Sequence, residues 1–246
     1  MYLEIQVQKN KEERKSMKNK FLKNLIIILI IIVLCVGLVL CVPQIFNFIK
    51  IKIEISNTLK SIDNLYELKN DTLLNSMKLY NEELANGKQE AFFTSDIYEN
   101  PKFLLKDYNV YNDELLGKIY IPKVNITLPL FNGAKEENML KGAVCWGNTS
   151  LPIGGENTNT VISAHNIYYG NEMFFKIYNL EIGDDIYIEN FWEELHYKVC
   201  NFVTTENDDF SYSYIENGRS LITLTTCYNY PENDKRYIVV AEQIKN

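Results

Sequence analysis

Glycine and proline are scarce in this chain of 246 residues, with 11 and 6 copies respectively. These counts exclude a collagen-like or low-complexity protein, and no internal repeat is evident. Histidine is rarer still, since the chain has only two, and no group of residues has the spacing of a metal site. The sequence therefore gives no reason to expect a metal or any other cofactor.

Positive charge is also limited, because 25 lysines and arginines stand against 32 aspartates and glutamates. Residues 1–24 nevertheless hold seven of the basic residues and only three glutamates, a net charge of +4. The other 222 residues carry the balance of the overall −7, which is −11. An acidic body of this kind argues against nucleic acid as a partner.

One run of 18 residues, from Leu25 to Val42, has no charged side chain. This length reaches the threshold for a helix that crosses a bilayer. A buried core helix would usually have a polar face, and a cleaved signal peptide would have a shorter apolar part and a better cleavage site than Pro43-Gln44-Ile45. We therefore expect an uncleaved anchor at 25–42. The basic residues 1–24 would be a cytoplasmic tail and the rest extracellular, as in a single-pass type II membrane protein.

Beyond the anchor the hydrophobic pattern changes twice. Residues 43–90 have apolar positions at spacings of three and four, which predicts a helical extension. Residues 91–113 form an irregular connector, and residues 114–246 show short β runs separated by turns, with short helices at 136–143 and 171–180. Seven or eight such strands predict a closed barrel or a sandwich. The expected strand runs are GKIYIP (117–122), VNITLPLF (124–131), TVISAH (160–165), DDIYIEN (184–190), ELHYKVCNFVTT (194–205), SLITLTTC (220–227) and RYIVVAEQI (236–244).

Outside the anchor the cysteine count is odd, so at least one exported thiol is expected to be unpaired. The three are Cys145, Cys200 and Cys227. Cys227 lies at the end of a β run just before a polar turn, and His165 ends another apolar run. Catalytic side chains tend to occupy such positions, where a loop begins at the end of a rigid strand. His196 lies mid-strand on the same face as Lys198, which is typical of a solvated strand face.

A nearby imidazole can take the proton of a thiol and so produce the thiolate, the stronger nucleophile. Arg236 lies nine residues after Cys227, at the start of another β run. If the two strands are neighbours, its guanidinium returns beside the thiol. Guanidinium cannot act as a base, but its fixed N–H donors can hold a peptide carbonyl or a developing oxyanion. Taken singly, such a cysteine is most often a small packed residue, and such an arginine a surface cation.

The run TLTTC (223–227), with Arg236 nine residues later and an upstream strand ending in SAH (163–165), resembles the sortases. These are membrane-anchored cysteine transpeptidases of Gram-positive bacteria, and the likeness covers about residues 115–243. The family pattern Thr-Leu-x-Thr-Cys is matched by Thr223, Leu224, Thr226 and Cys227. The resemblance implies a mostly β fold, an eight-stranded β-barrel with short helices. It implies His165, Cys227 and Arg236 as catalytic residues, and we expect substrate contacts from Ser163, Thr225 and Thr226.

The resemblance also implies a reaction. A transpeptidase of this family would cleave an LPXTG-like sorting motif between threonine and glycine through a thioacyl intermediate on Cys227. The acyl group would then pass to an amine, either a pilin lysine during pilus assembly or a peptidoglycan precursor. The expected partners are surface or pilin proteins with a C-terminal sorting signal.

The unbroken TSLPIGGENTNTVISAH (149–165) and the short Cys-to-Arg spacing look most like the pilus-building class C sortases. Class C enzymes carry a lid with an Asp-Pro-aromatic tip. Asp96 and Tyr98 match that tip, with Ile97 in place of proline, so we expect a lid here and keep a plain linker as the alternative. Class C enzymes commonly have a second transmembrane helix after the last strand, where this sequence ends at Asn246. Both departures leave a class B-like or D-like enzyme, which anchors single proteins to peptidoglycan, as the alternative.

Two other classes of protein fit part of the pattern. A papain-like protease also uses cysteine and histidine, but its cysteine precedes its histidine in the chain, the reverse of the order here. A non-catalytic adhesin or sensor domain would suit the anchor, the helices and the barrel. It gives no reason for a thiol, an imidazole and a guanidinium to lie at strand ends.

Overall fold

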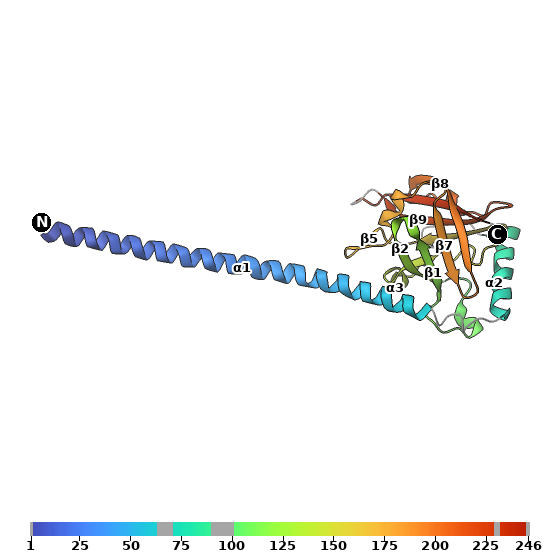
Figure 1. Cartoon of the computed structure of the whole chain (residues 1–246), viewed down its shortest axis with the longest axis horizontal. Coiled ribbons are helices and arrows are strands. Elements are labelled where there is room, and N and C mark those ends of the chain that lie inside the picture. The colour runs from blue at the N-terminus through green and yellow to red at the C-terminus, as the bar shows by residue number, and fades with distance from the viewer. Residues whose placement is uncertain (1, 63–70, 90–100, 229–231, 245–246) are drawn as a thin grey trace. The chain divides into compact units, whose positions relative to one another are not determined.

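The computed structural model describes residues 2–62, 71–89, 101–228 and 232–244. It divides the chain into two compact units, residues 1–49 and residues 50–246. Within the described residues of the second unit, eight strands close a barrel in the order β1-β2-β3-β4-β9-β10-β8-β7 (Figure 1). The eight-stranded barrel implied by the resemblance is therefore confirmed. Its strands are β1 (Leu115–Ile121), β2 (Ile126–Asn132), β3 (Ala143–Cys145), β4 (Thr158–Ser163), β7 (Asp185–Asn190), β8 (Glu194–Glu206), β9 (Ser220–Tyr228) and β10 (Lys235–Gln243).

The alternation of apolar and polar residues decides which face of each strand is buried. In β7 and the first half of β8 every second side chain is buried, among them Ile186, Ile188, Leu195 and Tyr197. Strand β9 differs, because residues 220–226 are all buried. Its Ile222 and Leu224 belong to the main core, whereas Leu221 packs with Ile238 and Val240 in a second small cluster on the opposite face. A strand covered on both faces is a rigid support for the residue at its end.

The parallel pairings set the place of β4 in the barrel. Strand β4 runs parallel to β9, and β3 runs parallel to β2, whereas the other barrel pairs are antiparallel. In a parallel pair the two carboxyl ends lie at the same edge of the sheet. The loop after β4 and the end of β9 are therefore neighbours.

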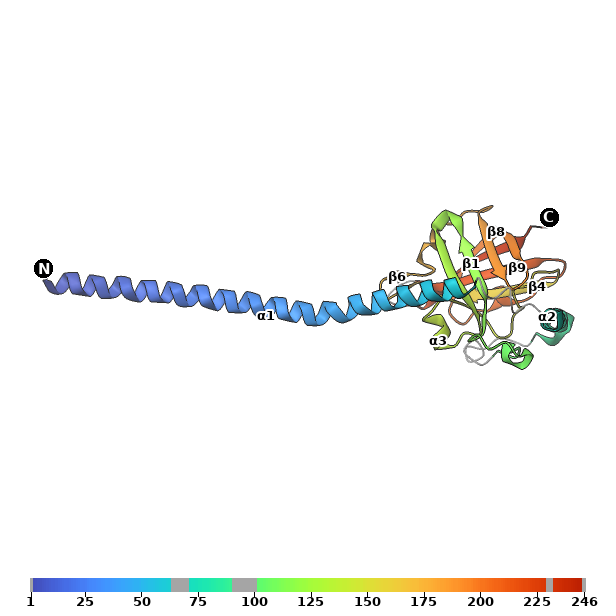
Figure 2. The same cartoon turned by 60° about the horizontal axis from the view of Figure 1, so that its bottom comes forward.

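Helix α2 (Asp71–Glu83) packs against the barrel, as both views show (Figures 1 and 2). Its Leu73 and Met77 are buried in the same core as the strands. Tyr80 donates to the carbonyl of Gly147 at 2.8 Å, and Asn81 exchanges two hydrogen bonds with the backbone of Leu151, at 2.8 and 3.1 Å. A π-helical turn (Leu84–Lys88) follows, and Gly87 within it has a φ of +90°, which suits glycine.

One local expectation was confirmed and one was wrong. Of the one or two helical turns expected at 136–143, one forms as α3 (Glu136–Met139), and the chain then enters β3, a strand that was not expected. A strand of three residues that pairs with distant partners leaves little local pattern. The run 171–180 is not one helix, because β6 (Asn171–Glu172) pairs with β5 (Ile167–Tyr168) and a 3-10 helix follows at Phe175–Asn179. The amides of residues 173 and 174 donate to the carbonyls of Asn166 and His165 instead of to a helix.

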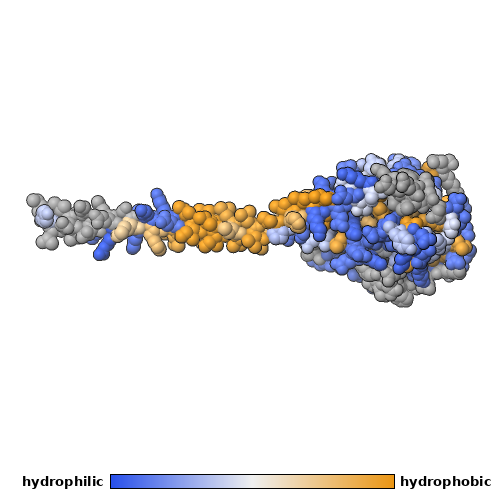
Figure 3. Space-filling model, turned by 90° about the horizontal axis from the view of Figure 1, so that it is seen from below, coloured by the Kyte–Doolittle hydropathy of each residue, from blue (hydrophilic) through white to orange (hydrophobic). Residues whose placement is uncertain are grey.

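The first unit holds most of helix α1 (Tyr2–Ile62), which contains the uncharged run. An 18-residue window of this helix is long and apolar enough to cross a membrane, and none of it is buried. Figure 3 shows the apolar side chains as one band on the helix. In the second unit, Ile51 and Ile62 at the end of α1 belong to the barrel's hydrophobic core.

Candidate active site

Cys227 and Arg236 lie directly opposite each other on adjacent antiparallel strands, β9 and β10. Side chains at such positions have Cβ atoms about 4.5–5.5 Å apart. The predicted adjacency of the two strands is therefore confirmed. The guanidinium of Arg236 is oriented by its own turn, since Nη1 donates to the carbonyls of Asn233 at 3.0 Å and Lys235 at 2.9 Å. Among the described residues the other guanidinium nitrogens have no further hydrogen-bond partner, and Arg236 and Cys227 line one pocket.

His165 reaches the same place from β4, which ends two residues earlier than the expected run, at Ser163. Ser163 pairs with Thr225 of β9 in the parallel ladder. Three hydrogen bonds continue the connection beyond the strand: Ala164 N to Thr225 O at 3.4 Å, Thr226 Oγ1 to Ala164 O at 2.9 Å, and Asn166 Nδ2 to Cys227 O at 3.1 Å. His165 is therefore held next to the end of β9.

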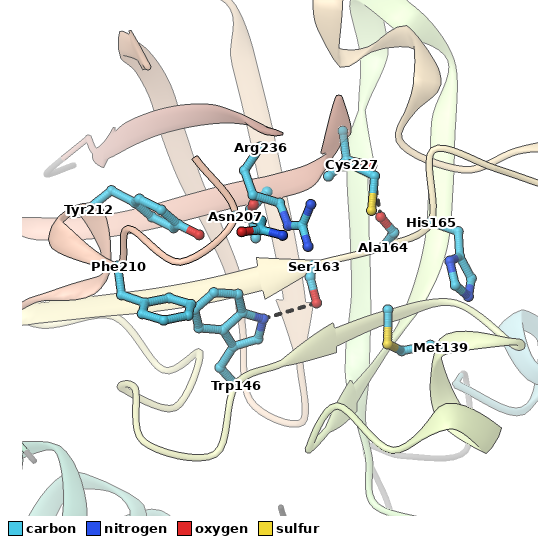
Figure 4. A pocket seen from close by; sticks show the side chains of 12 residues that line it. Met139, Trp146, Ser163, Ala164, His165, Asn207, Phe210, Tyr212, Cys227 and Arg236 are labelled. Atoms are coloured by element: carbon cyan, nitrogen blue, oxygen red, sulfur yellow. Dashed lines mark hydrogen bonds between the residues drawn. The ribbon is translucent and has the colours of Figure 1, made fainter. Parts of the chain in front are cut away.

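One pocket is lined by all three predicted catalytic residues, His165, Cys227 and Arg236 (Figure 4). In the view of Figure 4 the thiol lies between the guanidinium and the imidazole. The cavity is narrow, with a volume of about 60 Å³. On the side away from His165, the cavity is bounded by three aromatic side chains, Trp146, Phe210 and Tyr212. Trp146 contacts both of the other rings, with centroids 5.9 and 6.1 Å away. We call this cavity the donor pocket, after the acyl-donor peptide that we assign to it below.

The three residues expected to contact substrate, Ser163, Thr225 and Thr226, also line the donor pocket. Two of their hydroxyls are engaged, since Ser163 Oγ accepts from Trp146 Nε1 at 3.0 Å and Thr226 Oγ1 donates to Ala164. Thr225 is 1% exposed, and its hydroxyl makes no hydrogen bond of ordinary geometry with the described residues, although Tyr212 interacts with it. A buried hydroxyl without a full partner favours a ligand that supplies one.

The thiol of Cys227 is half-buried and free of any disulfide. Cys145 and Cys200 are also free, so the expectation that at least one of these three thiols is unpaired is confirmed. His165 is half-buried and stacks on Tyr168 with ring centroids 4.9 Å apart. Burial lowers the pKa of His165, because it disfavours the imidazolium, and the nearby Glu136 offsets part of this effect. A neutral imidazole is the form that can accept the proton of a thiol.

A tyrosine that the sequence did not single out holds the backbone of Cys227. Tyr178 donates to the carbonyl of Cys227 at 2.9 Å and accepts from Asn166 Nδ2 at 2.8 Å. Burial, followed by the influence of Cys227, raises the pKa of Tyr178 to about 12, so its hydroxyl stays a donor at neutral pH. Tyr178 lies in a run expected to be a plain helix. The sequence offered one signal for this cluster that was not used, the position of Asn166 directly after His165.

The second histidine lies elsewhere. His196 is on β8, where its Nε2 lies 2.6 Å from Asp185 Oδ1 and its ring stacks on Tyr187. It does not line the donor pocket. Within the described ranges, no cluster of three or more His, Cys, Asp or Glu side chains is arranged to hold a metal ion. Asp96 and Tyr98 lie outside the described residues, and the lid stays a prediction.

A family model for the sortase domain matches residues 119–244. The chain belongs to the sortase family. The matched region contains the barrel from the last residues of β1 onward and includes His165, Cys227 and Arg236. Among curated sortases, the Sortase A of Bacillus anthracis is 29% identical over 131 residues, which cover 53% of this chain. The match spans 60% of that relative, less than two thirds of its length.

Solved sortase structures match a longer part of the chain. The sortase C from Clostridium perfringens SM101 is 32% identical, with a TM-score of 0.62, and the match covers 78% of this chain and 98% of that one. The Streptococcus pneumoniae Sortase C is 28% identical, with a TM-score of 0.65, and the match covers 77% and 97%. This sortase is therefore similar in fold to class C structures over more than its barrel.

Proposed function

We propose that this sortase-family chain is a cysteine transpeptidase that cleaves an LPXTG-like sorting motif between its threonine and its glycine. The observation that carries the proposal is the single pocket lined by Cys227, His165 and Arg236. The family membership and the register of Cys227 opposite Arg236 support it. A pocket of about 60 Å³ has room for only part of the motif, which we take to be the threonine at the bond to be cleaved.

In the first half of the reaction, His165 takes the thiol proton and the thiolate of Cys227 attacks the threonine carbonyl carbon. The C–N bond to glycine breaks, and His165 returns the proton to the departing glycine amine. Arg236 donates to the carbonyl oxygen while it carries negative charge, and Thr225, which lines the same pocket, adds a second donor. The product is a thioester between threonine and Cys227.

In the second half, an amine attacks the thioester carbon and the C–S bond breaks. The proton lost by the amine passes to His165, and the thiol of Cys227 is restored. We propose a protein lysine, as in a pilin, as this amine. The likeness to sortase C structures supports the choice, and the study of the Streptococcus pneumoniae enzyme concerns pilin substrate specificity. The alternative is attachment of single surface proteins to a peptidoglycan amine. This alternative is a class B-like or D-like enzyme, and the similarity to the curated Sortase D of Bacillus subtilis, at 28% identity, favours it.

We propose that residues 25–42 anchor the enzyme, with residues 1–24 in the cytoplasm and residues 43–246 outside. The unburied apolar window of α1 and the basic tail before it support this topology. Protease added to intact protoplasts should digest the catalytic domain and spare the tail. Protection of the catalytic domain would refute the topology.

The reaction is tested with the full chain in detergent micelles and a labelled peptide that contains the motif. Mass spectrometry should find a thioacyl adduct on Cys227, and Cys227→Ala should form none. Cys200→Ala is the matched control and should keep the adduct, because Cys200 does not line the donor pocket. A parent enzyme without an adduct, or an adduct on Cys200, would overturn the proposal.

A further inference from the structure

The three aromatic side chains that bound the donor pocket come from two separate segments of the chain. Trp146 belongs to residues 146–151, which follow β3, and Phe210 and Tyr212 belong to residues 210–215, which lie between β8 and β9. We call these two segments the wall segments. Neither lies in a barrel strand, so the ladders of the barrel do not pair them with each other. The width of the donor pocket therefore depends on the contacts that join the two wall segments.

Gln89 joins the wall segments through its side-chain amide. Its Nε2 donates to the carbonyl of Asn148 at 3.4 Å in one segment and to the carbonyl of Ser213 at 3.2 Å in the other. Its Oε1 accepts from the backbone amide of Ile215 at 3.1 Å. Because all three partners are backbone groups, these hydrogen bonds act on the course of both wall segments and not on a single side chain.

The helix before Gln89 fixes its position. Gln89 comes directly after the π-helical turn that continues α2. Helix α2 is itself bonded to the first wall segment, since Tyr80 donates to the carbonyl of Gly147 and Asn81 exchanges two hydrogen bonds with the backbone of the same segment. All three residues lie outside residues 119–244, which the sortase family model matches. A contact from outside the matched region thus reaches the wall of the donor pocket.

A second attachment keeps the wall segments on the barrel. The Nδ2 of Asn159 in β4 donates to the carbonyls of Tyr212 and Tyr214, both at 3.0 Å. The backbone carbonyl of Asn159 accepts from the amide of Ser150 at 3.1 Å. Because these bonds do not involve Gln89, we expect a substitution of Gln89 to loosen the donor pocket and not to unfold the protein.

We propose that Gln89 is a positioning residue that sets the width of the donor pocket, and thereby the selectivity for the residue whose carbonyl Cys227 attacks. Gln89 does not line the pocket and acts through the backbone of the two wall segments. With its hydrogen bonds in place, the narrow cavity accepts threonine and excludes the bulkier leucine, because a side chain too large for a packed pocket forces its walls apart. Without them the wall segments separate and leucine enters.

This inference rests on the proposed transpeptidase function, and the experiment separates the two. The full chain in detergent micelles is given either of two labelled peptides, which differ only in having threonine or leucine before the glycine of the motif. The kcat and the KM for thioacyl formation on Cys227 are measured with each peptide. The ratio of the two kcat/KM values is the preference for threonine, and this ratio does not depend on the folded fraction of a preparation.

Two substitutions of Gln89 are compared with one control. Gln89→Ala removes the amide. Gln89→Glu keeps the size of the side chain and the acceptor for Ile215, but at neutral pH it has no N–H to donate. The matched control is Asn190→Ala, because Asn190 also makes three hydrogen bonds to backbone groups, at 2.8–3.0 Å, and does not line the donor pocket.

The parent should prefer the threonine peptide about tenfold or more. Each Gln89 variant should reduce this preference about fivefold or more and raise the KM for the threonine peptide about threefold or more. The kcat for the threonine peptide should stay within about twofold of the parent, because Gln89 touches none of the reacting groups. Asn190→Ala should leave the preference within about twofold.

The role of Gln89 is refuted if its variants keep the parent's preference, or if Asn190→Ala reduces the preference as far as they do. A fall in kcat at unchanged KM also refutes it, because Gln89 would then act on the reacting groups and not on the pocket walls. A change in Gln89→Ala alone would assign the effect to packing and refute the hydrogen-bond role. A parent that accepts both peptides equally refutes this inference alone, whereas a parent without an adduct on Cys227 contradicts the transpeptidase function itself.

Discussion

The hydroxyl of Tyr178 donates a hydrogen bond of 2.9 Å to the backbone carbonyl of Cys227. The same carbonyl oxygen accepts from Asn166, the residue that follows His165. The loop that carries the imidazole and the strand end that carries the thiol are thus joined through one oxygen atom. The distance between nucleophile and base therefore depends on Tyr178 and Asn166, neither of which has a proposed role in bond making or breaking.

Tyr178→Phe removes this donor and keeps the ring, which packs on Tyr228 and Tyr237. Because one hydrogen bond contributes about 1 kcal/mol, we expect kcat for thioacyl formation to fall about fivefold. The KM for the donor peptide should change less than about twofold. Stopped-flow measurement of adduct formation gives both constants. Tyr111→Phe, on an exposed ring outside the donor pocket, is the control. Equal effects of the two substitutions would exclude a positioning role for Tyr178.

Arg236→Lys should lower kcat/KM for the sorting-motif peptide by a factor of about ten or more. A lysine ammonium keeps the positive charge. It cannot donate to the backbone carbonyls of Asn233 and Lys235 and also present a fixed pair of N–H groups to the substrate carbonyl. Arg219→Lys is a matched control, because Arg219 pairs with Glu216 and Glu242 and does not line the donor pocket. Steady-state cleavage assays compare the two variants. Full activity of Arg236→Lys would remove the arginine from the proposed mechanism.

The lowered pKa of His165 predicts a dependence of stability on pH. The unfolded chain binds a proton at this histidine as the pH falls through about 6.5, whereas the folded protein does so only at a lower pH. His165 therefore destabilises the folded state as the pH falls from about 6.5 toward its folded pKa, and has no such effect above that window. We expect His165→Gln to lose less Tm than the parent between about pH 7.5 and about pH 5. Thermal scans across this range give the comparison, and an equal or larger loss in the variant would contradict the prediction.

Ile62→Ala should lower the free energy of unfolding by about 2–4 kcal/mol. Ile62 is 1% exposed and lies in the barrel's core cluster, so its truncation leaves a cavity. Ile53→Ala, at an exposed position of the same helix, should cost less than about 0.5 kcal/mol. Urea denaturation followed by the fluorescence of the two tryptophans, both in the barrel unit, measures each variant. If both substitutions lowered the free energy of unfolding by similar amounts, this part of α1 would not support the barrel.

Local pattern was enough to predict the parts of the fold that obey a local rule. The alternation of residues 184–205 predicted β7 and β8, because period two places every second side chain in the core. The uncharged run 25–42 predicted a helix, because a single segment can satisfy its own backbone hydrogen bonds in a membrane only as a helix. The short strand β3 was missed because its three residues pair with β2 and β4, which are distant in the sequence. The segment 171–180 was misjudged because its first residues bond back to residues 165–168 instead of along a helix.

For the site, the sequence by itself determined the reactive groups: one thiol, one imidazole and one guanidinium at the ends of β runs, in the order and spacing of a known family. Only the tertiary structure decided that they share a pocket, because that depends on the antiparallel register of β9 with β10 and the parallel register of β4 with β9. The hydrogen bonds of Tyr178 and Asn166, and those of Gln89 to the wall segments, were likewise decided there. The physical reason is that a residue type reveals what a side chain can do, whereas its neighbours across the sheet follow from pairings that no local pattern encodes.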